Sequence, residues 1–380
     1  MMTGWFRRAR QTRSTVTNRE EAHRQQRLAA CAAYRMLGAI GLIAQLMLWV
    51  TLYAYDRLVQ TTWQAALLLA LPLAGLWALW RRGEGALATQ KGARCTLLLL
   101  PCLVLDAAVL IRTLAGYISQ LIPEYPYWAC ALVPAVLCWL TALLSRENGA
   151  AYGASLFRLL LPGLFLLATV FLNTNAHSVR LWPLLGQGPA RTAAEALAGA
   201  GSGWGVALLF VLPLHSRRDD TARPAGARTA GARTAGRAAL WTALPWLMCV
   251  IWALWYAMVR PWRSGDALDV GERLMGLARH SHSPLLYECS GLLWMLLLPL
   301  ALTGSAVSGE KLLRSAAPRV PRSIAALIPL LPGTVAALVW PDDLLGALGW
   351  ALPWRALLSA AAGGALWALS ARKGRKVHAG

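Results

Sequence analysis

Four glycines alternate within a single apolar stretch of this chain, residues 193–213, with Ser202 and Trp204 between them. Each glycine costs roughly 1 kcal/mol relative to alanine inside a helix, so a continuous helix is not expected there. Within lipid, backbone that leaves the helix must line a cavity or be buried in protein. We therefore predict a broken membrane helix with a ligand site at the break, around Gly199, Gly201, Gly203 and Gly205.

A second glycine interruption lies in the first apolar stretch, where Gly38 and Gly41 precede Ala44 and Gln45. Small residues also allow helices to pack closely, and on these residues alone this is the simpler explanation. Their place in the chain favours a break, because the interruptions fall in the first and the sixth of ten apolar stretches. Matching interruptions in two halves indicate an inverted-repeat transporter fold.

Ionisable side chains within apolar stretches are the other candidates for chemistry. Asp106 and Arg112 lie in the third stretch, and Glu288 follows Tyr287 at the start of the eighth. A charge inside a span costs at least about 2.5 kcal/mol, so such a residue usually faces a cavity or a partner. Direct contact with a ligand and neutralisation of a charge on another helix both remain open for Asp106 and Glu288.

The composition sets the elements that must hold these residues. Hydrophobic residues make up 57% of the 380 residues and charged residues only 14%. Apolar stretches of about 20 residues are long enough to span a bilayer as helices. We predict an all-α polytopic membrane protein with a single transmembrane domain, 29–370, and helices at 29–53, 61–80, 95–117, 127–144, 155–172, 193–213, 238–259, 285–304, 323–340 and 347–370.

The net charge of +20 is distributed unevenly. With the N-terminus in the cytoplasm, the inner segments hold 27 Lys and Arg against 7 Asp and Glu, whereas the outer segments hold 7 of each. This asymmetry follows the positive-inside rule and predicts cytoplasmic basic tails at 1–28 and 371–380. It indicates attraction to the anionic lipid of the bilayer rather than binding of nucleic acid.

The sequence offers little support for an enzyme, a cofactor or a metal. The seven cysteines fall in or beside spans, without zinc spacing, and the six histidines lie in loops or tails. The Gly201–Gly205 sequence lacks the strand that a nucleophile elbow or a dinucleotide site requires. We therefore predict no cofactor and no catalytic residues.

Taken in order, these elements resemble the B-subunit (GerAB-like) family of spore-germination nutrient receptors, which belongs to the amino acid–polyamine–organocation (APC) transporter superfamily. The resemblance covers about residues 30–376. It is most specific at 181–188, Leu-Trp-Pro-Leu-Leu-Gly-Gln-Gly, followed by the glycine-rich sixth span that ends Phe-Val-Leu-Pro. Further matches are Ile40-Gly41 with Trp63, the sequence 121–126, and Glu288 with Trp294. Trp204 and Tyr287 depart from the residues usual in the family.

The resemblance implies a 5+5 inverted-repeat (LeuT-like) fold with broken helices 1 and 6. It also implies a non-enzymatic subunit that binds a small nutrient, an amino acid, and signals to A-type and C-type receptor subunits in the spore inner membrane. A secondary amino acid or amine transporter of the same superfamily is the alternative, because the scaffold is the same. A polytopic lipid or glycan transferase is the third hypothesis.

The topology predicts how such a ligand is held. The outer half of the first helix begins beyond Gly41, with free N–H groups near residues 42–44, and the inner half of the sixth begins near 203–206. Helix N-termini carry partial positive charge and unpaired donors, so together they suit a carboxylate. The predicted ligand-binding residues are Gly38, Gly41, Ala44, Gln45, Asp106, Gly199, Gly201, Ser202, Gly203, Trp204, Tyr287 and Glu288.

Overall fold

The computed structural model describes residues 37–53, 59–87, 89–144, 178–182, 184, 188–201, 243–258, 284–339 and 344–378. Within these ranges the chain forms helices joined by turns, with no strand. The first described helix comprises residues 37–48, and another spans Ala243–Met258. The others are η1 (Trp49–Tyr53), α2 (Val59–Leu68), α3 (Ala70–Leu87), α4 (Gln90–Cys95), η2 (Thr96–Leu99), α5 (Leu100–Leu121), α6 (Tyr127–Leu144), η3 (Ser178–Leu181), α8 (Pro189–Ala200), α12 (Pro284–Ala316), α13 (Arg322–Val339) and α14 (Leu344–His378).

Five stretches in the described part are long and apolar enough to cross a membrane. They match the second, third, fourth, eighth and ninth predicted spans, and the range of α6 is the predicted one. Helices α12 and α14 run past their predicted ends, so that α14 continues through most of the predicted basic tail. The fifth predicted span, 155–172, and the N-terminal tail, 1–28, lie outside the described residues.

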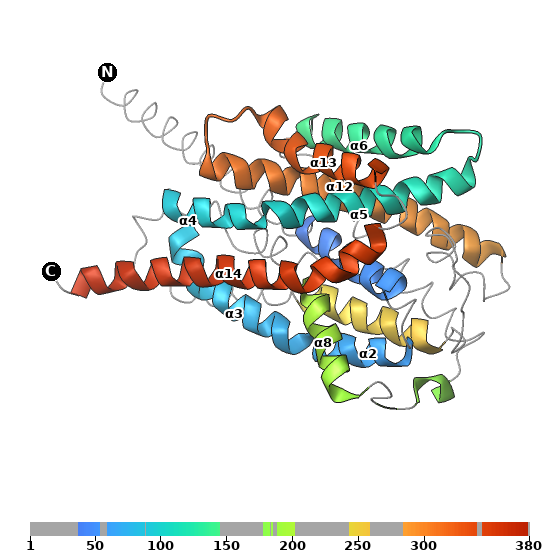
Figure 1. Ribbon diagram of the computed structural model, residues 1–380, viewed down its shortest axis with the longest axis horizontal. Helices are drawn as coiled ribbons and strands as arrows, with labels where there is room; N and C mark the ends of the chain where they lie inside the picture. The colour runs from blue at the N-terminus through green and yellow to red at the C-terminus, as the bar shows by residue number, and fades with distance from the viewer. Residues whose placement is uncertain are drawn as a thin grey trace, which may run out of the picture.

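Four helices form one half of the bundle. Figure 1 shows α5, α6, α12 and α13 side by side, and each of them packs against the other three. Small residues bring their backbones close together, as is typical of membrane helices. A Cβ on Gly333 of α13 would lie 2.9 Å from the Cβ of Ala107 in α5, and one on Gly309 of α12 would lie 2.6 Å from a ring carbon of Pro329. We call these four helices the scaffold group.

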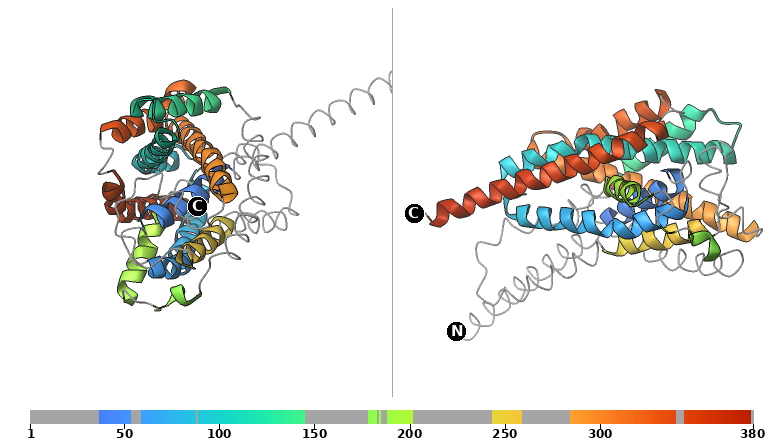
Figure 2. Two further views of the ribbon diagram at one scale, coloured as in Figure 1. Left: turned by 90° about the vertical axis from the view of Figure 1, so that its right-hand side faces the viewer. Right: turned by 60° about the horizontal axis from the view of Figure 1, so that its bottom comes forward.

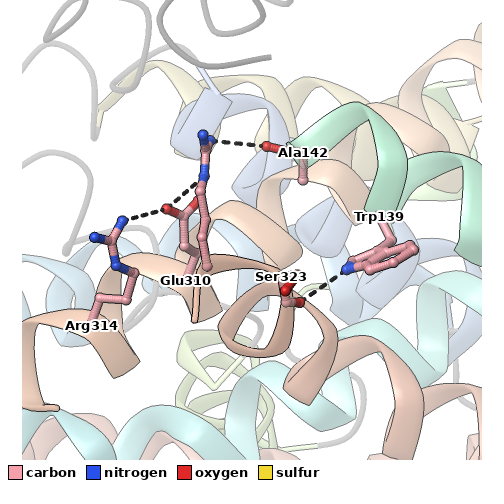
Figure 3. Close-up of polar contacts among 6 residues, drawn as sticks. Trp139, Ala142, Glu310, Arg314 and Ser323 are labelled. Atoms are coloured by element: carbon pink, nitrogen blue, oxygen red, sulfur yellow. Dashed lines mark hydrogen bonds and ion pairs between the residues drawn. The ribbon is translucent and has the colours of Figure 1, made fainter. Parts of the chain in front are cut away.

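Polar contacts join the scaffold helices where α12 ends and α13 begins (Figure 3). Glu310 of α12 forms ion pairs with Arg322 of α13, at 2.8 Å, and with Arg314 of its own helix, at 3.3 Å. Arg322 also donates to the carbonyl of Ala142 near the end of α6, at 3.2 Å. Because Arg322 connects α13 to both α12 and α6, this junction fixes the relative positions of three helices.

The other half of the bundle contains α2, α3, α8, the helix Ala243–Met258 and α14. Helix α14 lies along α3 (Figures 1 and 2), where the indole N–H of Trp80 donates to the carbonyl of Ser359 at 3.1 Å. The ring of Trp80 packs directly on Gly363, and Leu366 packs directly on Gly83 of α3, because neither glycine has a side chain. Helix α14 also contacts α5 and α8, so it connects the two halves.

The first-span helix is the most enclosed element of the described chain. Each residue from 37 to 51 is buried except Gly41, which is half-buried. Its neighbours include α12, where Gly304 lies against Leu37, and the helix Ala243–Met258, where the Tyr256 hydroxyl donates to the carbonyl of Thr51 at 3.5 Å. Nearly complete burial of an uncharged apolar helix is the main source of stability available to this element.

Candidate functional site

The first span departs from regular α-helix at η1, a π-helix of five residues. The Thr51 hydroxyl donates back to the carbonyls of Met47, at 2.9 Å, and Leu48, at 3.4 Å. Hydroxyl groups that back-bond in this way bend helices, and π-helical turns are frequent at functional sites. The side chains of Gln45 and Trp49 lie four residues apart and therefore share one face.

This position corrects the prediction for the first span. The chain is helical from residue 37 through Gly38 and Gly41 to Leu48, so the N–H groups of residues 42–44 belong to regular helix and are not free donors. Two glycines cost only about 2 kcal/mol of helix propensity, which burial of the whole span outweighs. Gly38 is buried, and a Cβ on Gly41 would meet nothing within 4 Å. The interruption lies at η1, eight residues beyond Gly41.

In the sixth span, regular helix ends inside the glycine cluster, as predicted. Helix α8 begins at Pro189 after Gly188, whose φ of +88° favours glycine, and ends at Ala200. Gly201 caps it with a φ of −73° and donates its N–H to the carbonyl of Ala198 at 2.9 Å. Ser202, Gly203, Trp204 and Gly205 lie outside the described residues.

The irregular ends of the first and sixth spans meet. A Cβ on Gly199 would lie 3.0 Å from Cζ2 of Trp49, so the absence of a side chain allows the indole of η1 to pack on α8. A Cβ on Gly201 would overlap the backbone carbonyl oxygen of Leu352 in α14. The end of α8 therefore packs against both η1 and α14.

A buried ion pair lies beside this meeting point. Arg355 of α14 donates through Nη2 to Oδ1 of Asp106 in α5, and the two residues are 2% and 3% exposed. Gln45 of the first span donates from Nε2 to the backbone carbonyl of Asp106, at 3.4 Å. Cys102, one turn before Asp106 on the same helix, is buried as well. Three helices therefore contribute polar groups to a single point inside the bundle.

The structure thus brings four predicted residues into one region and separates others from it. Gln45, Asp106, Gly199 and Gly201 surround the contacts of Trp49 and Arg355 described above, and Ala44 is fully buried in the first span. Glu288 is exposed near the start of α12 and makes none of the contacts described for this region. The backbone of Tyr287 is helical, while its side chain lies outside the described residues.

Three contributors, Trp49, Leu352 and Arg355, were not expected from the sequence. Arg355 carried a usable signal, because it is the sole charged residue in the last predicted span. Asp106 takes the role of ion-pair partner that the sequence left open for it. Arg112, the other charge in its span, donates to the Tyr127 hydroxyl at 3.0 Å and lies 4.9 Å above that ring.

In the part of the chain that the structure describes, no group of three or more His, Cys, Asp or Glu side chains is placed to hold a metal ion. The polar side chains whose contacts are described for this region include the carboxylate of Asp106, the amide of Gln45 and the guanidinium of Arg355. Because the carboxylate and the guanidinium already neutralise each other, this region suits a ligand that carries both charges better than one with a single charge.

Comparisons with known proteins agree with this architecture. No family model matches the chain, and no curated protein matches it either. Among solved structures, the chain is similar to a mutant of the manganese transporter of Eremococcus coleocola, with a TM-score of 0.55 and 15% identity over 87% of this chain and 76% of that one. A second mutant of that transporter gives 0.54 and 14% identity, with the same coverage.

The inward-facing conformation of Mhp1 is also similar, with a TM-score of 0.50 and 15% identity over 86% of this chain and 75% of that one. The chain has the LeuT-like fold. This result confirms the predicted fold class, an all-α membrane protein with a 5+5 inverted repeat. It accounts for the pairing of α5 and α6 with α12 and α13, because these are the third and fourth helices of the two repeats.

Proposed function

We propose that the protein is a ligand-sensing subunit built on a transporter scaffold, the B-type subunit of a spore germinant receptor. It binds a small nutrient, an amino acid, near the middle of the membrane and signals to A-type and C-type subunits. The observation that carries the binding site is the meeting of η1 with the end of α8, beside the Asp106–Arg355 ion pair. The sequence resemblance at 181–188 and through the sixth span supports the receptor role.

The site has the parts that a switch needs. A ligand shifts an equilibrium only through a difference in affinity between two states. The end of α8 lies against η1 and α14, and α14 contacts α5 of the scaffold group. A ligand that changes the packing of Gly199 or Gly201 therefore changes the position of α14 relative to the scaffold group, and partner subunits sense that movement.

Germination of spores tests this function. A strain that lacks the gene is complemented with the wild type, with Gly201→Leu, and with Gly75→Leu as a matched control. Gly75 is an exposed glycine of α3 at which a Cβ would meet nothing within 4 Å, whereas Gly201 abuts α14. We expect wild type and Gly75→Leu to restore the response to an amino acid mixture and Gly201→Leu to lose it at equal membrane levels. A full response from Gly201→Leu contradicts the proposed site.

A secondary transporter for an amino acid or amine is the second candidate. The similarity to the Eremococcus coleocola manganese transporter favours it, because that protein is a transporter with a comparable arrangement of helices. Uptake of labelled amino acids into proteoliposomes containing the purified full chain separates the two candidates. Accumulation above protein-free liposomes supports transport, while binding without uptake supports the receptor.

A further inference from the structure

The Asp106–Arg355 pair is costly for a structural contact. Both residues are almost fully buried, and each charge must be taken out of water inside a membrane protein. Apolar residues of similar volume often stabilise a fold as well as a buried ion pair does. Ionisable residues inside spans more often mark a functional site, and here both lie next to the irregular ends of two helices.

The surroundings of the pair connect it to both of those ends. Gln45, which bonds to the backbone of Asp106, precedes Trp49 of η1 by one turn. Leu352, whose carbonyl abuts Gly201 of α8, precedes Arg355 by about one turn. A molecule inserted between η1, α8 and α14 therefore reaches Asp106 and Arg355 before other charged groups of α5 and α14.

The two charges of the ion pair balance each other. Asp106 and Arg355 contribute one negative and one positive charge, and Arg112 lies two turns further along α5 in contact with Tyr127. Glu195 is buried on α8, one turn before Gly199, and makes a contact of its own. A ligand with a single charge that separates the pair leaves either Asp106 or Arg355 without an opposite charge in a low-dielectric region. A ligand with both charges provides an opposite charge for each of them.

We propose that the ligand is a zwitterion that opens the Asp106–Arg355 pair by exchange, an inference that rests on the function proposed above. The ligand carboxylate accepts two hydrogen bonds from the guanidinium of Arg355, and the ligand ammonium donates to the carboxylate of Asp106. Each protein charge has a partner before and after binding, so the exchange needs little net desolvation of Asp106 and Arg355. Opening the pair also removes a direct link between α5 and α14.

Thermal unfolding of the purified full chain in lipid nanodiscs tests this exchange. Three probes are compared: a mixture of the standard amino acids with uncharged side chains, a mixture of their C-terminal amides, which are cations, and a mixture of their N-acetyl derivatives, which are anions. We expect the amino acids to raise the unfolding midpoint. The two derivative mixtures should bind on the order of 100-fold more weakly, because each leaves one buried charge unpaired.

Variants provide a second measurement, the ligand-induced shift of the unfolding midpoint, which would not change if the pair had only a structural role. The double variant Asp106→Asn with Arg355→Gln removes both charges and leaves two neutral amides, so we expect it to keep the unfolding midpoint of the wild type but lose the shift with amino acids. The control Arg112→Gln removes a buried charge from the same helix, away from the site, and should keep the shift.

The outcomes separate the two proposals. A wild type that responds to none of the three mixtures contradicts the proposed function itself. Equal responses to amino acids and amides, or to amino acids and N-acetyl derivatives, show a ligand site but overturn the zwitterion exchange. An unchanged shift in the double variant also overturns it. If the double variant does not fold, the comparison of the three mixtures on the wild type still tests the zwitterion exchange.

Discussion

Replacing Gly201 by alanine tests the packing on which the candidate site depends. Gly201 has a φ of −73° and a ψ of −10°, which alanine adopts without strain, so the backbone itself does not oppose the change. The added Cβ overlaps the Leu352 carbonyl oxygen, a backbone atom that cannot rotate away. Overpacking of this kind typically costs about 1–3 kcal/mol, because α8 or α14 must shift to relieve it.

Gly41→Ala is the matched control for this substitution. Gly41 lies in the first-span helix, and a Cβ there meets nothing within 4 Å. The substitution should therefore stabilise the protein by up to about 1 kcal/mol through helix propensity alone. The two variants, each one methyl group larger than the wild type, are expected to differ by about 1–4 kcal/mol in the free energy of unfolding.

Reversible unfolding of the full chain by SDS in mixed micelles, followed by circular dichroism, measures this difference. Equal membrane insertion of both variants is checked first by expression level and protease protection. If Gly201→Ala unfolds at the same SDS fraction as Gly41→Ala, then α8 does not end against α14, and the geometry of the proposed site is refuted.

Three further predictions use the same unfolding assay. Asp106→Asn and Arg355→Gln alone should each cost about 3–5 kcal/mol, while the double variant should stay within about 1 kcal/mol of the wild type; additive effects in this double-mutant cycle speak against a direct pair. Glu310→Gln should cost about 1–2 kcal/mol by weakening the hold on Arg322, and increased hydrogen exchange confined to α13 would locate the effect. Trp80→Phe removes one indole hydrogen bond to α14 and should cost about 1 kcal/mol, with no loss expected if that bond is absent.

Much of the architecture could be predicted because the bilayer restricts a spanning chain to few solutions. Apolar stretches of span length located the helices, and the predicted range of the fourth span, 127–144, coincides with α6. The glycine cluster located the end of α8 at Ala200, because glycines lower the propensity for helix.

The same argument did not apply to Gly38 and Gly41 in the first span. Two glycines within a deeply buried helix cost less than burial returns, so the helix continues through them and changes only at η1. A π-helical turn depends on tertiary contacts such as that of Thr51 with Tyr256, which leave no local pattern in the sequence. The position of the interruption in this span could therefore be found only from the structure.

The partner of Asp106 was also beyond sequence patterns. Asp106 and Arg355 are 249 residues apart, and their contact follows from how α14 crosses between the two halves. Counting charges within spans identifies both residues as unusual but does not pair them, since Arg112 is an equally good candidate on sequence grounds. Gly199 could be predicted as a site residue, whereas the Trp49 indole that packs on it could not.

A cryo-EM map of the full chain in lipid nanodiscs, recorded with and without the amino acid mixture, tests the central claim most directly. We predict helix that stops at Ala200, and ligand density between Trp49, Gly201 and Arg355, with Asp106 no longer bonded to Arg355. Continuous helix through residues 199–210, or ligand density elsewhere while Asp106 and Arg355 remain paired, would contradict this account.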